Sequence, residues 1–207
     1  MIAFAWIVVS RWMSNRQQAV HATPAWIVPV VGLLDVPLAL PSLNLTPMTE
    51  LMVFSLAVGL FFAIPLFTLI FSRLLFEEPM PPNLQPTLLI LAAPFSVGFS
   101  TYVVTIGHID LFAEALYLLM IFVLSVLMGR LRGLPKCCPF RITWWAVSFP
   151  LAACAIAALQ FEAFDPNLFT QGVAGLLLVV ASLIIAGLLI RTVYGLLRGE
   201  LKTLSSA

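Results

Sequence analysis

Residues 172–197 read GVAGLLLVVASLIIAGLLIRTVYGLL, and Arg191 is the first charged side chain in this stretch. A helix that crosses a lipid bilayer needs about 20 predominantly apolar residues, because its backbone polar groups find no water in the hydrocarbon core. The uncharged part of the stretch already meets that length. It therefore predicts a membrane-spanning helix.

Further stretches of similar length and character lie at residues 25–43, 51–72, 86–106, 111–129 and 142–161. The composition agrees with this pattern, since 62% of the residues are hydrophobic and only 9% are charged. Soluble domains carry roughly 25% charged residues, so we expect lipid to be the solvent for much of the surface.

Residues 1–13 form a shorter apolar stretch, which Arg11 interrupts. Ten helical residues rise only about 15 Å, half of a hydrocarbon core of about 30 Å, so we expect a partial helix here. This would make the chain the C-terminal part of a longer protein or the product of a truncated gene.

Connections rich in Pro, Asp and Asn, at residues 73–82 and 162–167, predict helical hairpins. The predicted fold is a single all-α integral membrane domain over residues 1–207, with six full transmembrane helices and a partial N-terminal one.

The basic residues support this number of spans. If successive connections lie on alternating sides of the membrane, all 10 Lys and Arg residues fall on one side. They are Arg11, Arg16, Arg73, Arg130, Arg132, Lys136, Arg141, Arg191, Arg198 and Lys202. The opposite connections hold no basic residue but contain Glu50, Asp110, Glu114, Glu162 and Asp165. Because Lys and Arg are enriched in cytoplasmic connections, we predict a multi-pass protein of the cytoplasmic (inner) membrane with a cytoplasmic C-terminus.

Other classes of function find little support in the residues. A net charge of +1 without a Lys/Arg-rich run predicts no nucleic-acid partner. Cys137, Cys138 and Cys154 show neither a disulfide framework nor metal-ligand spacing. Gly-x-Ser-x-Gly and His-Glu-x-x-His motifs are absent, and His21 and His108 fall in or near connections, which does not support haem ligation. We therefore expect no catalytic residues, no metal site, no cofactor and no enzymatic activity.

Helix-breaking prolines are concentrated in the first, third and fifth full spans. They are Pro29, Pro37 and Pro41 in the first, Pro94 in the third and Pro150 in the fifth, whereas Pro65 lies in the second. A proline inside a helix frees a backbone carbonyl, which in lipid must be satisfied by protein or by water in a cavity. The pattern favours alternate helices facing an interior while the others face lipid. The alternative is that proline is simply common in membrane helices.

The proline-containing spans also carry polar candidates for this interior. Ser96, Ser100 and Thr101 lie on the third span, and their hydroxyls can either coordinate an ion or serve interhelical packing. Asp35 lies near the middle of the first full span, where an acid is costly. It is either a functional group or a structural acid that is protonated or paired with Ser or Thr. The candidate lining residues are Asp35, Pro29, Pro37, Pro94, Ser96, Ser100, Thr101 and Ser148.

Three motifs lie in order along the chain. They are AWIVPVVG at residues 25–32, FEEPMPP at 76–82 followed by PT at 86–87, Pro94 and GF at 98–99, and WWAVSFPL at 144–151. Over about residues 20–200 the chain thereby resembles the tellurite-resistance/dicarboxylate transporter (TehA-like) family, which includes the plant slow-type anion channels. The third motif, an aromatic pair followed by Ser-Phe-Pro, is the most specific.

The resemblance implies a fold of ten helices in five hairpins around a central pore, assembled as a homotrimer, of which this chain holds the C-terminal part. In that family a phenylalanine beside a proline kink on the ninth helix plugs the pore, and it matches Phe149, with Pro150 after it. The alternative is that Phe149 packs in the core of the bundle. The chain departs from the family in two ways. It lacks the first three helices and most of the fourth, and it has an acid, Asp35, within a predicted pore-lining span. The charge of Asp35 would repel an anion unless the side chain is protonated or lies off the pore.

The resemblance thus leads us to expect transport of small anions across the membrane lipid, by a channel or carrier of the C4-dicarboxylate/tellurite-resistance type with Phe149 as its gate. A non-transporting membrane subunit, or a degenerate fragment of such a transporter, is the alternative.

Overall fold

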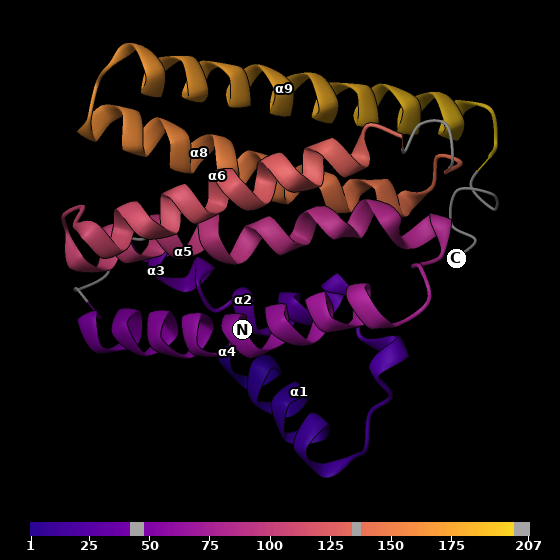
Figure 1. Ribbon diagram of the computed structural model, residues 1–207, viewed down its shortest axis with the longest axis horizontal. Coiled ribbons are helices and arrows are strands. Elements are labelled where there is room, and N and C mark those ends of the chain that lie inside the picture. Colours follow the sequence, from indigo (N-terminus) through magenta and orange to yellow (C-terminus); the bar gives the residue numbers. More distant parts are fainter. Residues whose placement is uncertain (42–47, 134–137, 201–207) are drawn as a thin grey trace.

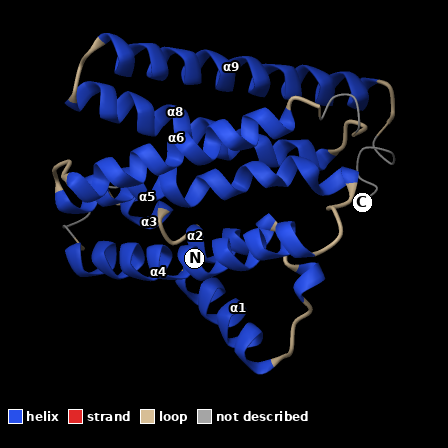
Figure 2. Cartoon of the chain, viewed as in Figure 1, coloured by secondary structure: helices blue, strands red, loops and turns tan. Residues whose placement is uncertain are grey.

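The computed structural model describes residues 1–41, 48–133 and 138–200, and every element in these residues is a helix (Figure 2). Five helices are long and apolar enough to cross a membrane, and successive ones run antiparallel (Figure 1). With η marking a 3₁₀ helix, they are α4 (Thr49–Phe76), η4 with α5 (Pro82–Ala92 and Ala93–Ile106), α6 (Leu111–Leu131), η5 with α8 (Ile142–Val147 and Ser148–Phe164) and α9 (Leu168–Leu197). The structure confirms the predicted all-α membrane class.

The first predicted full span, residues 25–43, is not one continuous helix. Its described part consists of η2 (Pro24–Ile27), α2 (Val28–Val31) and α3 (Asp35–Ala39), and its last two residues lie outside the described residues. Pro29 and Pro37 remove backbone donors, and between α2 and α3 the N–H of Leu34 bonds the carbonyl of Val31, three residues back, at 2.8 Å. The prediction of six full helices is corrected to five continuous helices and this broken segment.

The short N-terminal helix is present as α1 (Ile2–Ser14) and runs obliquely to the bundle (Figure 1). The connection after it contains η1 (Ala19–His21). The ring of Trp12 stacks on that of Trp26 at a centroid distance of 5.5 Å, which holds α1 against η2.

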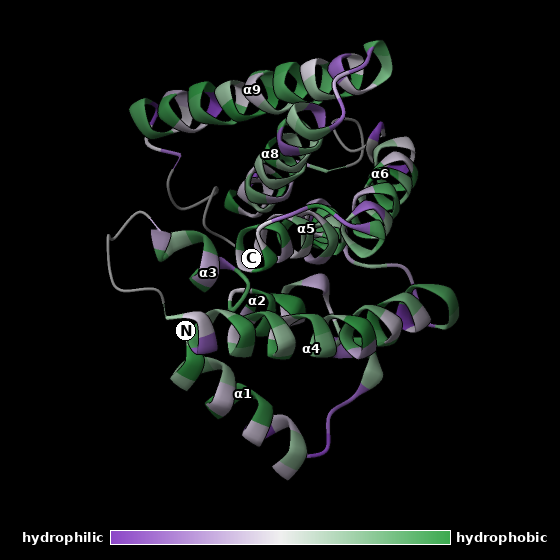
Figure 3. Ribbon diagram, turned by 90° about the vertical axis from the view of Figure 1, so that its left-hand side faces the viewer, coloured by the Kyte–Doolittle hydropathy of each residue, from purple (hydrophilic) through white to green (hydrophobic). Residues whose placement is uncertain are grey.

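The proline-containing segments occupy the interior of the bundle. In the most apolar part of each span, 61% of the residues are buried in Pro82–Ile106 and 44% in Ile142–Phe164, against 33% in α4, 33% in α6 and 17% in α9. In the view from the side of the acidic end, α5 lies in the middle, and α9 lies along one edge, opposite α1 (Figure 3). The outer helices expose large apolar side chains, such as Leu183 and Ile190 on α9. This arrangement agrees with the predicted alternation of interior and lipid-facing helices.

Aromatic rings from three helices form the centre of the core. Tyr117 of α6 and Phe161 of α8 stack at 4.0 Å, and Phe99 of α5 lies 5.7 Å from Tyr117. Such pairs contribute about 0.5–1.5 kcal/mol each beyond the area they bury. The hydroxyl of Thr101 donates to the carbonyl of Leu34, which ties α5 to the broken segment.

The charged side chains of the five long helices and of their connections lie at the two ends of the bundle. At the basic end, on the right in Figure 1, α4, α6 and α9 end and η4 and η5 begin. This end carries Arg73, Arg130, Arg132, Arg141, Arg191 and Arg198, together with Glu77, Glu78 and Glu200. The acidic end carries Glu50, Asp110, Glu114, Glu162 and Asp165. Lys136, Cys137 and Lys202 lie outside the described residues.

Candidate functional site

A cavity of about 380 Å³ lies where the three proline-containing segments meet. It is lined by Met1, Ile27, Val28, Val31, Gly32, Asp35, Ile90, Ala93, Ala146, Phe149 and Pro150. Three of these, Asp35, Phe149 and Pro150, are site residues predicted from the sequence. The fold therefore brings together candidates from the first and fifth predicted spans.

Each of the three segments changes from a 3₁₀ helix to an α-helix beside this cavity. The α-helices begin at Val28, Ala93 and Ser148, and a proline follows within two residues, at Pro29, Pro94 and Pro150. A proline in the first turn of an α-helix costs little, because the N–H that it lacks would have no partner in the helix. Each proline thus permits a helix start in the interior, and the cavity lies among the three starts.

Phe149 borders the cavity and is not enclosed in the core of the bundle, since 50% of its surface is exposed. Pro150, directly after it, is buried. The hydroxyl of Ser148 donates to the carbonyl of Trp145 at 2.7 Å, across the change from η5 to α8. The backbone that carries Phe149 is therefore fixed on both sides of the ring.

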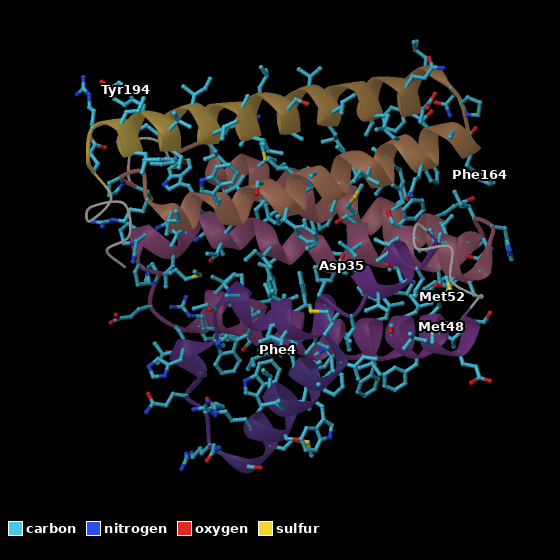
Figure 4. The ribbon with its side chains drawn as sticks, turned by 180° about the vertical axis from the view of Figure 1, so that it is seen from behind. Phe4, Asp35, Met48, Met52, Phe164 and Tyr194 are labelled. Atoms are coloured by element: carbon cyan, nitrogen blue, oxygen red, sulfur yellow. The ribbon has the colours of Figure 1, made fainter. Side chains whose placement is uncertain are left out.

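Among the described residues that line the cavity, Asp35 has the only polar side chain. It is the first residue of α3, is half-buried, and lies between the two ends of the bundle (Figure 4). Within the described part of the chain it forms no ion pair, and its carboxylate accepts no hydrogen bond. The lining that the described residues provide is thus apolar except for one acid, and none of these residues has a basic side chain.

The predicted hydroxyl candidates of the third span do not line this cavity. Ser96 donates to the carbonyls of Ala92 and Ala93 at 3.3 and 3.2 Å, and Thr101 donates to Leu34. Ser100 is buried in the same helix. The hydroxyls of Ser96 and Thr101 therefore satisfy backbone carbonyls near the helix breaks, which is the packing alternative for those two residues.

Three predicted prolines shape the segments without lining the cavity. Pro37 and Pro94 are buried, and Pro29 is half-buried. Pro94 instead borders a separate groove of about 250 Å³ between α4 and α6.

Several lining residues were not predicted, because they are aliphatic and carry no chemical signal. Ile27, Val28, Ile90 and Ala146 are examples. Their positions do carry a signal, since each lies within four residues before the proline of a helix start. In the described part of the chain, no three His, Cys, Asp or Glu side chains are placed to hold a metal ion.

Comparison with known proteins places this architecture in a family. A family model described as SLAC1, voltage-dependent anion channel, matches residues 1–193. The S-type anion channel SLAH3 of Arabidopsis thaliana is 28% identical over an alignment that covers 90% of this chain and 29% of the relative. An uncharacterized transporter of Methanocaldococcus jannaschii is 26% identical, over 64% of this chain and 44% of its own length.

This chain spans less than half the length of these relatives. The match nevertheless includes all three proline-containing segments and the cavity between them. It also confirms the family resemblance predicted from the three motifs. The chain is a multi-pass membrane protein and belongs to the SLAC1, or voltage-dependent anion channel, family.

Proposed function

We propose that this protein forms part of a pathway for small anions across the cytoplasmic membrane, and that the cavity beside Phe149 belongs to that pathway. The observation that carries the proposal is the meeting of three interior helix starts around one cavity. Membership of the voltage-dependent anion channel family supports it. In this proposal the basic end faces the cytoplasm, and the assembled protein is a homotrimer.

Phe149 acts as the gate in this proposal. Its ring borders the cavity, half of its surface is exposed, and it lies between the Ser148–Trp145 hydrogen bond and Pro150. An apolar ring closes a pathway by excluding water and by offering an ion no ligand. Rotation of the ring would open the pathway without a change of the backbone.

Asp35 makes the pathway dependent on protons in this proposal. The described lining residues include no basic side chain, so a carboxylate there repels an anion, and within the membrane the charged form is itself costly. Protonation removes both penalties. This favours a carrier that moves C4-dicarboxylates together with protons; tellurite is a further candidate substrate.

The gate is tested by measuring anion efflux from liposomes that contain the purified chain. Phe149→Ala should raise the chloride and malate flux, because it removes the ring from the cavity. Phe54→Ala is the matched control, since Phe54 is 48% exposed on α4 and does not line the cavity. Equal fluxes in the two variants would remove Phe149 from the gate. The absence of flux from every form of the chain would favour the non-transporting membrane subunit.

The role of Asp35 is tested in the same liposomes over a range of pH. Asp35→Asn should abolish the pH dependence of malate flux, and Glu50→Gln, at the acidic end, should retain it. If Asp35→Asn and the unaltered chain give the same pH profile, Asp35 has a structural role.

A further inference from the structure

A second groove, of about 490 Å³, opens on the outside of the bundle between α4 and α6. Both helices pack against α5, and α6 also packs against η4; residues of α5 and η4 form the floor of the groove. Phe67 and Phe71 of α4 contribute stacked rings to one wall, and Phe95 of α5 meets Phe67 edge to face at 5.4 Å. The lining is apolar except for Thr68 and Arg130.

These two polar residues differ in whether their polar groups already have a partner within the protein. The hydroxyl of Thr68 donates to the carbonyl of Ile64 at 2.9 Å, so it is already satisfied within α4. Arg130 is exposed at the basic end, and no carboxylate among the described residues forms an ion pair with it. The groove is therefore an apolar furrow with one uncompensated positive charge at its mouth.

The length of the groove corresponds to one leaflet of a bilayer. Along α6 it extends from Leu119 to Arg130, which at 1.5 Å per residue is about 17 Å. Half of a bilayer hydrocarbon core is about 15 Å. A smaller groove continues between the same helices toward the acidic end, and none of the described residues that line it is charged. Only the half that ends at the basic side thus combines an apolar furrow with a cation.

We propose that this groove binds one phospholipid of the leaflet on the basic side, with an acyl chain along α6 and an anionic headgroup phosphate on Arg130. Arginine matches the geometry of a phosphate and can bind it through two parallel hydrogen bonds. The apolar walls contribute to the affinity for any acyl chain, while Arg130 selects the negative headgroup.

The exposed charge of Arg130 favours a lipid over a helix from a second copy of the chain. A packed helix would cover the guanidinium of Arg130, which is costly unless it brings a matching carboxylate.

Native mass spectrometry of the purified chain in detergent, titrated with dioleoyl lipids, tests the proposal. Phosphatidylglycerol should bind about fivefold more tightly than phosphatidylcholine with the same acyl chains, since one Arg near an anionic headgroup contributes about that factor. Arg130→Gln should abolish this preference. Arg16→Gln, which removes an exposed charge from the connection after α1, should retain it.

A second pair of variants tests the furrow itself. Val126→Trp should fill the groove and weaken both lipids, whereas Val179→Trp, at a site of equal exposure on α9, should weaken neither. A preference that survives Arg130→Gln, or equal lipid binding by the two tryptophan variants, would overturn the proposal. So would an oligomer that Val126→Trp dissociates without loss of lipid, because the groove would then be a contact between copies.

Discussion

Gly59 is the residue at which α4 makes room for the broken segment. The side chain of Leu34, which is fully buried, lies directly over it. A Cβ atom at position 59 would meet Cδ2 and Cγ of Leu34 at 2.5 and 2.6 Å, closer than such contacts can be. The same residue, Leu34, accepts the hydroxyl of Thr101 through its carbonyl, so it cannot easily move away.

Replacing Gly59 with Ala should therefore destabilise the protein by about 1–3 kcal/mol, the usual cost of forcing an extra carbon into a packed core. Gly187→Ala is the matched control, because nothing lies within 4 Å of a Cβ at that position of α9. Thermal unfolding in detergent, followed by circular dichroism, measures both variants. Equal melting temperatures for the two would show that Leu34 can shift at little cost.

Asp110 is the residue that starts α6 at the acidic end. Its carboxylate accepts the N–H groups of Phe112 and Ala113, each at 3.0 Å, and the hydroxyl of Tyr102 at 2.7 Å. The hydrogen bond from Ala113, followed by that from Tyr102, lowers the pKa of Asp110 below its ordinary value of 3.8. The folded protein thus holds this carboxylate in its charged form more firmly than the unfolded chain does.

The sign of the resulting pH dependence follows from this lowered pKa. The contribution of Asp110 to stability should be complete above pH 3.8 and should be lost as the pH falls through the lower pKa of the folded state. Asp110→Asn still caps the helix but does not titrate. Relative to this variant, the melting temperature of the unaltered protein should fall as the pH drops below 3.8. Tyr102→Phe removes one donor and should reduce the difference. A constant difference across acid pH would contradict the assignment.

At the scale of elements, the sequence predicts the long helices well and their interruptions poorly. The spans of α4 and α6 follow from unbroken apolar runs, because lipid leaves a backbone no alternative to helical pairing. The broken segment from Pro24 to Ala39 is equally apolar. Its prolines predict a kink but not a division into separate short helices, and this arrangement packs against Gly59 and Thr101, which lie elsewhere in the chain. The cavity could not be predicted for the same reason, since its lining comes from three segments that only the fold brings together.

The start of α9 shows how a local polar signal corrects a hydrophobic prediction. The apolar run predicts a helix from residue 172, yet α9 begins at Leu168. Asn167 accepts the N–H groups of Phe169 and Thr170 at 3.0 Å, and the hydroxyl of Thr170 accepts the N–H of Asn167. This capping box pairs backbone groups that the apolar run alone would leave unsatisfied, so the helix begins one turn earlier.

Removal of this cap should loosen the first turn of α9. We expect Asn167→Ala to cost about 1 kcal/mol and to accelerate hydrogen exchange at the amides of Phe169 and Thr170. Asn167→Asp should retain both properties, because its carboxylate still accepts those amides. Exchange measured by mass spectrometry separates the variants. If Asn167→Ala exchanges as slowly as Asn167→Asp, packing against α8 rather than the cap fixes this end of α9.

At the scale of the whole molecule, the segregation of charge predicts which way the bundle lies in the membrane. The basic end should face the cytoplasm, since Lys and Arg near membrane-spanning helices are retained there. Cysteines introduced into a chain without its natural ones can report the side of each connection. His108→Cys lies at the acidic end, Gly133→Cys at the basic end, and Gln17→Cys before the broken segment, all at exposed positions.

A membrane-impermeant maleimide added to intact cells should label His108→Cys alone, and all three variants should react once the membrane is opened. Gly133 and His108 are separated by α6, so labelling of Gly133→Cys instead of His108→Cys would reverse the orientation.

Gln17→Cys tests the broken segment, which is too irregular to be identified as a span by helix length. If that segment crosses the membrane, it is followed by two further crossings, α4 and the η4–α5 helix, before His108. Helix α6 then crosses once more before Gly133. Gln17→Cys and Gly133→Cys would therefore lie on the same side and should react alike. Labelling of Gln17→Cys together with His108→Cys would mean that residues 24–41 enter the membrane and return to the same side. The three segments around the cavity would then not be equivalent crossings, and the proposed pathway would lose one wall.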